Sequence, residues 1–340
     1  MFIPTESDKP TSIGLSPLAH IKKVSSANMV SAVIPTYNRA SRVCLAIRSV
    51  LAQTNPPGEV IVVDDGSKDA TRDLIREQFG SRVTVITHEF NQGISVARRT
   101  GYLAARGEWI AYLDSDDLWP QDALDKLVEQ ALICDQRTVV VSGDMMIDNK
   151  QGEPRSHFLD HGFKLDGPVC PLDCRDVVFP RMLPYFQSSL IRRSALEATK
   201  SFEEGLRIGE DTLVFGQLAV HGKFIIIPAI TCHNDKSGES ELSLHQDEIE
   251  NPNFPLSRIL LIQALNATGQ PGFRVSEYAG WVREWIRCQQ KSGLVVGPMV
   301  LMEQFRYRVH LKSMIFACCA ISRNALILGR AIFAGRTTAE

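Results

Sequence analysis

Between residues 30 and 142 the sequence alternates short apolar runs with longer stretches whose apolar residues recur every three or four positions. Runs rich in β-branched residues are typical of buried strands, and the longer stretches have the period of helices. The predicted strands cover residues 30–34, 60–63, 83–87, 109–113 and 139–142. The predicted helices between them cover residues 43–51, 67–79, 95–106 and 121–134. This alternation predicts an α/β fold with a Rossmann-like, doubly wound and mostly parallel sheet.

Polar segments follow three of the predicted strands directly. The first strand runs into residues 35–37 (PTY), the second into 64–65 (DD) and the fourth into 114–117 (DSDD). Ligands of open parallel sheets bind beyond the carboxyl ends of the strands, so we expect these segments to line one crevice. Carboxylates this close together repel one another, so crowding three of them within four positions is costly.

The rest of the chain lacks this regular alternation. Residues 151–184 are rich in Pro, Gly, His and Asp and predict a long loop or lid. A strand and helix follow near residues 188–199, and a last strand covers 224–227. We therefore expect a flexible tail over residues 1–28, one catalytic-type domain over 29–245 and a helical region over 246–340.

Composition limits the classes of protein to consider. The chain has 340 residues, of which 44% are hydrophobic and 22% charged, and its net charge is −2. This composition is globular and does not favour a nucleic-acid partner. Eight cysteines in a chain of this length predict no disulfide framework and favour the reducing cytosol. We see no signal-peptide pattern and no spanning segment, but the basic, apolar C-terminus would allow peripheral contact at the inner face of the cytoplasmic membrane.

Four segments, in order along the chain, carry a family resemblance. They are residues 30–54 (with VIPTYN), 59–71 (with VVDDGS), 91–117 (with ARR and LDSDD) and 209–222 (with GED). Together they resemble the family 2 glycosyltransferases, inverting sugar transferases of the GT-A fold, over roughly residues 29–235. The resemblance implies a nucleotide-diphospho-sugar donor, most simply a UDP-sugar. It also implies a glycan or lipid-linked acceptor in cell-surface polysaccharide or glycoconjugate synthesis.

The resemblance assigns the acidic turn to a cation. A diphosphate leaving group carries heavy negative charge, and Mn²⁺ or Mg²⁺ would neutralise it. Asp114 and Asp116 match the DxD motif of the family. Asp116 would bind the cation directly, whereas Asp114 would face it through water or contact the donor. Asp117 would either contact the sugar or cap the helix that follows.

The nucleotide site is implied at the ends of the first two strands. Pro35, Thr36 and Tyr37 resemble the nucleotide loop of the family, with Thr36 lining the base pocket. Asp64 or Asp65 would hydrogen-bond the uracil or the ribose, and Asp64 is preferred for the base edge. The alternative is that DDGS is only a solvated turn.

Arg98 matches the arginine of the ArN pattern of the family, although Arg99 replaces the asparagine. The resemblance implies a contact with the diphosphate or the base. The alternative is that Arg98 lies on an exposed helix face.

An inverting transfer needs a base that takes the proton of the acceptor hydroxyl. The GED segment supplies Glu210 and Asp211. By resemblance Asp211 is the base and Glu210 contacts the acceptor. The alternative is that both acids only stabilise a helix N-terminus through its dipole.

Histidines and cysteines raise two further metal hypotheses. His233 ends the last predicted strand, where many family members place a histidine near the metal, and a structural role is the alternative. Beyond it Asn234, Lys236 and Ser237 are expected diphosphate contacts. A second set of residues has the ligand types of a zinc site without the spacing of a standard finger: His157, His161, Cys170 and Cys174.

Other enzyme classes fit less well. An aspartyl phosphohydrolase would need an acid where Val63 stands, and a dehydrogenase or nucleotidyltransferase would need glycines in the PTYNRAS loop. Processive synthases of the family carry QxxRW, which residues 304–308 do not match. The remaining alternative is a catalytically inactive sugar-binding, nucleotide-binding or scaffold protein of the same fold. The presence of both acidic motifs favours the enzyme.

Overall fold

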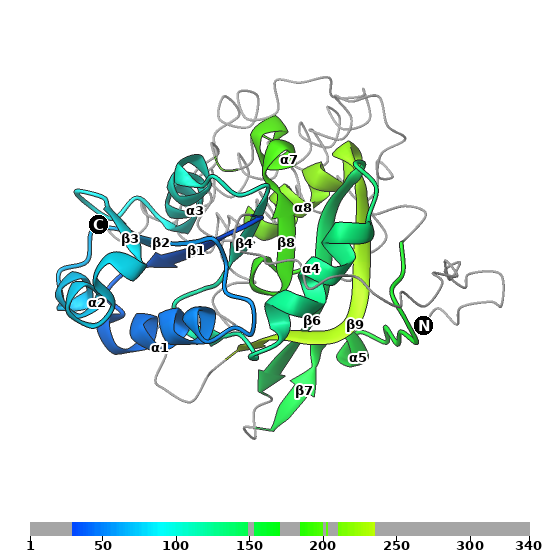
Figure 1. Ribbon diagram of the computed structural model, residues 1–340, viewed down its shortest axis with the longest axis horizontal. Coiled ribbons are helices and arrows are strands. Elements are labelled where there is room, and N and C mark those ends of the chain that lie inside the picture. The colour runs from blue at the N-terminus through cyan, green and yellow to red at the C-terminus, as the bar shows by residue number, and fades with distance from the viewer. Residues whose placement is uncertain (1–28, 149–152, 171–183, 200–201, 203–209, 235–340) are drawn as a thin grey trace, which may run out of the picture. The chain divides into compact units, whose positions relative to one another are not determined.

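A computed structural model describes residues 29–148, 153–170, 184–199, 202 and 210–234, all within the unit Met1–Leu242. In these residues nine strands form one mixed sheet with helices on both faces (Figure 1). The predicted α/β class and mostly parallel, doubly wound sheet are confirmed. The predicted tail 1–28 and the helical region 246–340 lie outside the described residues, and the proposed domain boundaries stay predictions.

The first half of the sheet is parallel. Its elements are β1 (Val30–Thr36), α1 (Ala40–Leu51), β2 (Glu59–Asp64), α2 (Thr71–Phe79), the 3₁₀ turn η3 (Gly80–Arg82), β3 (Thr84–Thr87), α3 (Ile94–Ala104) and β4 (Trp109–Tyr112). β1 lies between β2 and β4, and β3 pairs with the outer edge of β2. Each predicted strand and helix of this half is present, and only the ends differ.

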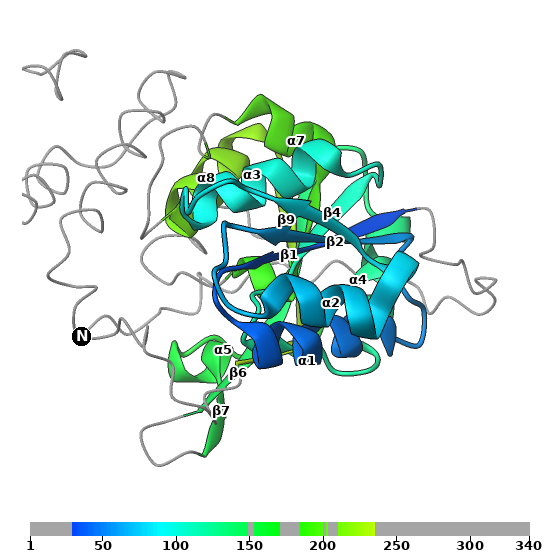
Figure 2. The same cartoon turned by 90° about the vertical axis from the view of Figure 1, so that its left-hand side faces the viewer.

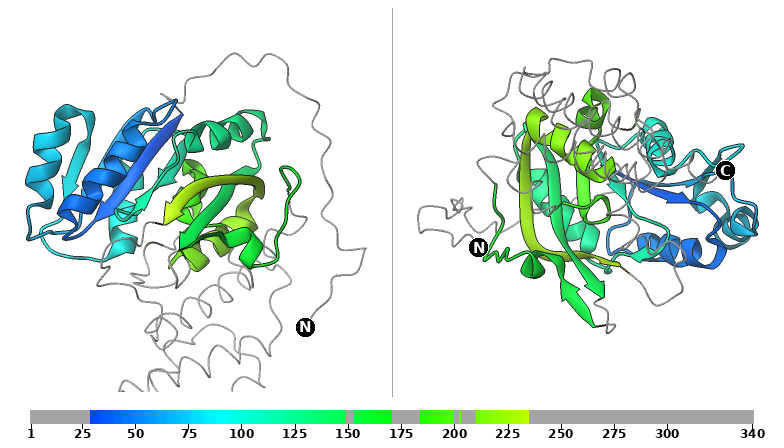
Figure 3. Two further views of the ribbon diagram at one scale, coloured as in Figure 1. Left: turned by 90° about the horizontal axis from the view of Figure 1, so that it is seen from below. Right: turned by 180° about the vertical axis from the view of Figure 1, so that it is seen from behind.

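The second half departs from simple alternation. Its elements are β5 (Asp117–Leu118), α4 (Ala123–Ile133), β6 (Thr138–Asp148), β7 (Pro154–Ser156), α5 (His157–Asp160), η4 (Phe186–Ser188), β8 (Ser189–Arg192), α7 (Arg193–Ala198), α8 (Glu210–His221) and β9 (Lys223–Asn234). The predicted fifth strand, β6, is not the neighbour of β4, because β8 inserts antiparallel between them. The long, curved β9 runs parallel beside β6 (Figure 3).

Three expectations about boundaries were wrong. Residues 151–184 are not only a loop, since β7 pairs with β6 and α5 follows it. The second helix begins at Thr71 rather than at residue 67, because Asp64 accepts a hydrogen bond from Ser67 N (3.0 Å) and Asp69 accepts one from Thr71 N (3.1 Å). These side-chain bonds hold residues 67–70 as a turn. The last strand extends well past the predicted 224–227.

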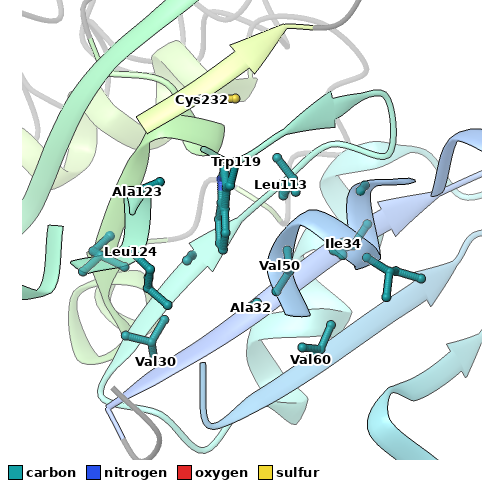
Figure 4. Packing of buried hydrophobic residues seen from close by; sticks show 14 of the residues in the cluster. Val30, Ala32, Ile34, Val50, Val60, Leu113, Trp119, Ala123, Leu124 and Cys232 are labelled. Carbon is teal, nitrogen blue, oxygen red and sulfur yellow. The ribbon is translucent and has the colours of Figure 1, made fainter. Parts of the chain in front are cut away.

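Two hydrophobic cores lie on opposite faces of the sheet, because successive side chains of a strand point to opposite sides. Helices α1, α2 and α4 cover one face, and α3, α7 and α8 cover the other (Figure 2). Along β1, Ala32 and Ile34 belong to the first core and Val33 to the second. Figure 4 shows Trp119, which follows the acidic turn, standing in the first core between Leu113 and Ala123.

Helix α3 packs closely on β1 through a small residue. A Cβ atom at Gly101 would lie 2.2 Å from Val33 Cγ1, so the helix could not approach this strand with a larger residue there. Ala97 lies one turn earlier on the same buried face. Ala97 and Gly101 thus give α3 a buried face of small residues, and the helix places Arg98 beside the carboxyl end of the sheet.

Neither a disulfide nor a spanning helix occurs in the described part of the chain. Cys44, Cys134, Cys170 and Cys232 are free thiols there. The helices of that part are too short or too polar to cross a membrane.

Candidate functional site

The three predicted polar segments meet at one edge of the sheet. β1, β2 and β4 run parallel, so their carboxyl ends face the same way. Thr36 pairs with Asp64 in register, and Asp65 N donates a hydrogen bond to Thr36 O (2.9 Å). Leu113 N, just before the acidic turn, donates to Val33 O (3.0 Å). The first loop, the DD segment and the DSDD segment therefore lie next to one another.

The loop after β1 is braced by the loop after β2. Asn38 N donates to Ser67 Oγ (2.9 Å), and Asn38 Oδ1 accepts from Lys68 N (2.8 Å). Arg39 N donates to Thr71 Oγ1 (3.1 Å). Asn38 has a positive φ of 50°, which asparagine tolerates better than most residues. These bonds hold the backbone before α1 in place.

Asp64 and Thr36 carry buried oxygens that lack hydrogen-bond partners among the described residues. Thr36 is 4% exposed and its Oγ1 has no partner there. Asp64 is fully buried, and its Oδ2 lies 3.3 Å from Arg72 Nε, an ion-pair distance without hydrogen-bond geometry. Buried polar atoms in proteins are usually paired, so these two oxygens are suited to a ligand.

Asp65 has a structural role. Its carboxylate accepts hydrogen bonds from Gln92 N (2.9 Å) and Gly93 N (2.8 Å) and lies 2.7 Å from His88 Nδ1. Both oxygens are thereby used to hold the loop before α3. The turn after Asp65 requires glycine, because Gly66 has φ of 78° and a Cβ atom there would lie 2.6 Å from the Phe90 carbonyl carbon.

Asp114 is held from two sides. Arg98 Nη2 donates to its Oδ1 (2.8 Å), and the amide of Gln187 donates to its Oδ2. Gln187 is itself held, since its carbonyl accepts a hydrogen bond from Trp119 Nε1 (2.8 Å). Because both oxygens of Asp114 already accept hydrogen bonds, its side chain has one defined orientation.

Arg98 joins the acidic turn to the GED segment. It is 2% exposed, its Nη1 lies 2.5 Å from Glu210 Oε1, and its guanidinium lies 4.4 Å from the centre of the Phe186 ring. Burial disfavours the charged guanidinium, but Asp114 and Glu210 outweigh that effect and raise the pKa of Arg98. The alternative of an exposed helix face is therefore wrong. Arg98 is the buried counter-ion of two acids that are far apart in sequence.

Asp116 is the more accessible acid of the turn. Its side chain is 31% exposed, and Arg39 Nη1 lies 3.1 Å from its Oδ2. Burial and the charge of Asp114 raise the pKa of Asp116, while Arg39 and Arg42 act against this. The crowding of like charges predicted from the sequence is thus present, and a cationic group already offsets it.

Asp117 does not cap a helix, contrary to one of our alternatives. It begins β5, which pairs with β9, and its Oδ1 accepts a hydrogen bond from Asn234 Nδ2 (2.7 Å). The next helix begins at Ala123, six residues later in the chain. Burial, together with Asp114 and Asp116, raises the pKa of Asp117 well above its usual range. Asn234 thus contacts an aspartate of the turn, whereas Lys236 and Ser237 lie outside the described residues.

Glu210 and Asp211 begin α8 and differ in environment. Burial raises the pKa of Glu210 to about 7, although Arg98 opposes this shift. Asp211 is half-buried, and its Oδ1 accepts a hydrogen bond from Thr212 N (2.6 Å). Both acids lie in the first turn of the helix, so stabilisation by the helix dipole applies as well.

The two metal hypotheses that involve histidine gain no support from the geometry. In the ladder between β5 and β9, His233 pairs with Leu118 while Asn234 pairs with Asp117, so His233 points to the opposite face. Among the described residues no three His, Cys, Asp or Glu side chains form a metal-binding group.

The second histidine set does not assemble in that part of the chain either. The rings of His157 and His161 are tilted against each other with centroids 4.1 Å apart, and His157 also lies against Tyr185. His161 Nδ1 lies 2.9 Å from His157 O. Cys170 is a free thiol, and Cys174 lies outside the described residues.

Sequence reasoning missed three contributors to the site. Arg39 follows the PTYN motif directly, and its charge next to that motif was a usable signal. Trp119 stands two residues after the DD of the acidic turn, so it could also have been predicted from the sequence. Gln187 lies in a short 3₁₀ turn whose sequence has no feature that points to the site.

The sequence matches the family model described as "Glycosyl transferase family 2" over residues 31–197. It is 34% identical over 209 residues to the "Succinoglycan biosynthesis protein ExoO" of Rhizobium meliloti. The aligned region covers 59% of this chain and 58% of that protein. It is 38% identical over 104 residues to the "UDP-Glc:alpha-D-GlcNAc-diphosphoundecaprenol beta-1,3-glucosyltransferase WfgD" of Escherichia coli, over 31% of this chain and 41% of that protein. The chain thus spans less than two thirds of these relatives.

Solved structures resemble the fold. The crystal structure of S. aureus TarS 1–349 aligns with a TM-score of 0.55 and 19% identity, over 85% of this chain and 77% of that chain. The same fragment in complex with UDP-GlcNAc aligns with a TM-score of 0.52 and 17% identity, over 87% and 80% of the two chains. At these identities the likeness shows the fold, which is GT-A-like. Residues 31–197 of the chain therefore form a glycosyl transferase family 2 domain.

Proposed function

We propose that the protein is an inverting glycosyltransferase that moves a sugar from a UDP-sugar to an acceptor hydroxyl in the synthesis of a surface polysaccharide. One observation carries the proposal. Arg98 binds Asp114 of the acidic turn and Glu210 of the GED segment at the same time. The acids assigned to the donor and the acids assigned to the acceptor therefore lie in one site.

The buried oxygens of Thr36 and Asp64, at the ends of β1 and β2, support the assignment of the nucleotide. Thr36 Oγ1 and Asp64 Oδ2 are buried without hydrogen-bond partners among the described residues, so a base or ribose would supply the missing donors. Asp65 is already used by the loop before α3, which leaves Asp64 as the acid for the base edge. Pro35 and Tyr37 flank Thr36, and the exposed ring of Tyr37 is available to the nucleotide.

The acidic turn fits a divalent cation held by one carboxylate. Asp116 is partly exposed, is an oxygen ligand of the type that Mn²⁺ and Mg²⁺ prefer, and already attracts a guanidinium. Asp114 has both oxygens occupied by Arg98 and Gln187, so it would face the cation through water or the donor. Mg²⁺ is commonly held by one or two carboxylates together with substrate phosphates. Bound in this way, the cation would neutralise the charge of the departing diphosphate.

Asp211 is the proposed base. It is half-buried at the start of α8, and in the structure it does not share the guanidinium that binds Glu210. A carboxylate placed opposite the donor would take the proton of the acceptor hydroxyl as that oxygen attacks the anomeric carbon. Glu210, held by Arg98, would fix the start of the helix and contact the acceptor.

The acceptor is inferred from relatives. WfgD, by its name, acts on a diphosphoundecaprenol-linked sugar, and ExoO, by its name, belongs to succinoglycan biosynthesis. We propose a lipid-linked glycan as the acceptor. Association of the protein with a membrane surface would bring it to such a substrate.

The test compares donor binding with transfer in two variants. Titration calorimetry with UDP-sugars and Mn²⁺ measures binding, and release of UDP in the presence of undecaprenyl-diphosphate-linked sugars measures transfer. We expect D211N to bind donor with a Kd within about threefold of wild type and to lose at least about 100-fold in transfer, which is the usual contribution of a general base.

D116N is the counterpart, and we expect it to lose metal-dependent donor binding. Transfer by D211N at near the wild-type rate would place the base elsewhere. Donor binding by the wild type without turnover on any acceptor would favour a binding or scaffold protein.

A further inference from the structure

Arg39 lies where a cation would approach Asp116. Its Nη1 is 3.1 Å from Asp116 Oδ2, and the two side chains are 19% and 31% exposed. The acidic turn does not need this partner for its shape. The turn is closed by the hydrogen bond from Asp117 N to Asp114 O (3.1 Å), and Trp119 N donates to Ser49 Oγ (3.2 Å) just beyond it. The ion pair therefore balances charge rather than supporting the fold.

The backbone of Arg39 is fixed while its side chain can move. Arg39 N donates to Thr71 Oγ1 (3.1 Å), and Arg39 O accepts from Val43 N at the start of α1 (2.9 Å). Only the long side chain reaches across to the acidic turn. It can leave Asp116 by rotation about its own bonds, and the loop that carries it need not rearrange.

A divalent ion and the guanidinium compete for the same oxygen. Asp116 is crowded by Asp114, and Arg39 is a cation in direct contact with it. An ion that binds Asp116 Oδ2 would lie within a few ångströms of the guanidinium, where like charges repel strongly. Both cannot occupy this position, so Arg39 has to move when the metal binds.

We propose that Arg39 is a built-in counter-ion that a divalent cation must displace from Asp116, so that Arg39 lowers the affinity of the free protein for the cation. This inference rests on the cation site of the proposed function. The donor diphosphate would add oxygen ligands for the ion, so tight metal binding requires the nucleotide. Arg39 thereby keeps the acidic turn neutralised between catalytic cycles.

The test measures Mn²⁺ binding to the whole chain without nucleotide, by electron paramagnetic resonance of the free ion. Loss of an ion pair worth about 0.5–1 kcal/mol corresponds to a change of about 2- to 5-fold in Kd. We expect R39Q to bind Mn²⁺ tighter by about this factor and R39K to bind like the wild type. R48Q is the matched control, because Arg48 lies in the last turn of α1, at the opposite end of the helix from Arg39, and donates a hydrogen bond to Gln78.

D116N separates this inference from the proposed function. If D116N loses Mn²⁺ binding while R39Q binds no tighter than the wild type, the role of Arg39 is refuted and the metal site stands. If D116N binds like the wild type, the metal site and the role of Arg39 both fall. Equal tightening in R48Q would indicate a general charge effect and would also refute the inference. Thermal unfolding verifies that each variant is folded, and R39M replaces R39Q if the latter is not.

Discussion

Arg98 shows how one buried residue determines the organisation of a site. Its side chain is 3% exposed and is surrounded by two carboxylates and the Phe186 ring. Without Arg98, the charges of Asp114 and Glu210 would lose their shared counter-ion in a region with little water. Leaving a buried charge unpaired is among the most costly single changes in a protein. Arg98 is therefore a positioning residue whose removal is felt in stability as well as in function.

We expect R98M to lower the free energy of unfolding by about 3–5 kcal/mol, the usual cost of removing one partner of a buried ion pair. R98M leaves Asp114 and Glu210 without their shared counter-ion, and E210Q removes one of these two charges. The double variant R98M/E210Q should therefore be more stable than the sum of the two single changes in free energy of unfolding predicts. Urea unfolding of the four proteins measures this coupling.

R106M is a control for the loss of an arginine. Arg106 pairs with Glu59, but its own side chain is 84% exposed. We expect this variant to cost less than about 1 kcal/mol. A loss in R98M no larger than that in R106M would mean that the buried network contributes little.

At the scale of elements, the position of α3 depends on the absence of a side chain. The helix approaches β1 at Gly101, where a Cβ atom would overlap Val33 Cγ1 at 2.2 Å. Glycine is normally unfavourable inside a helix, by about 0.5–1 kcal/mol relative to alanine. Glycine at this position nevertheless allows α3 to pack closely on β1, which brings Arg98 within hydrogen-bond distance of Asp114 in the acidic turn.

The contact between Gly101 and Val33 predicts whether G101A lowers or raises the stability of the protein in two different backgrounds. In the wild-type background G101A should destabilise the protein by about 2 kcal/mol, because overpacking a core costs roughly 1–3 kcal/mol. In the V33A background the same change should be neutral or stabilising, since the overlapping atoms are gone and alanine favours helix. Thermal unfolding of the wild type, G101A, V33A and the double variant V33A/G101A measures both effects. Destabilisation by G101A of equal size in both backgrounds would show that Val33 is not the obstacle.

An element can be predicted from the sequence when local interactions form it, and not when it depends on contacts between distant parts of the chain. The seven strands and α-helices from β1 to β4 follow from local periodicity, and the strand ends at Thr36, Asp64 and Tyr112 explain why the polar segments converge. The insertion of β8 between β4 and β6 depends on long-range pairing, which no local pattern encodes. The same holds for Gln187, whose link to Asp114 spans 73 positions. Side-chain hydrogen bonds at Asp64 and Asp69 likewise overrode the helical pattern over residues 67–70.

At the scale of the whole molecule, one sheet connects the two cores and carries the site at its edge. Helices bury the sheet on both faces (Figure 2). A ligand that contacts the ends of β1, β2 and β4 therefore binds strands whose side chains pack in both cores. The buried oxygens of Thr36 and Asp64 that lack hydrogen-bond partners among the described residues reduce stability in the absence of a ligand. A nucleotide that satisfies them should therefore stabilise the entire described unit rather than a single loop.

We accordingly expect UDP with Mn²⁺ to raise the midpoint of thermal unfolding. A ligand at 100 times its Kd stabilises the folded state by about 2.7 kcal/mol, which corresponds to a shift on the order of 5 °C in a domain of this size. Adding EDTA, or the substitution D116N, should remove most of the shift, because both remove the cation between Asp116 and the diphosphate. D64N should reduce the shift while leaving its dependence on Mn²⁺ intact, because Asp64 is assigned to the base and not to the metal. An equal shift with EDTA would mean that the nucleotide binds without a cation, and arginines such as Arg39, Arg42 and Arg98 would then balance the charge of the acidic turn.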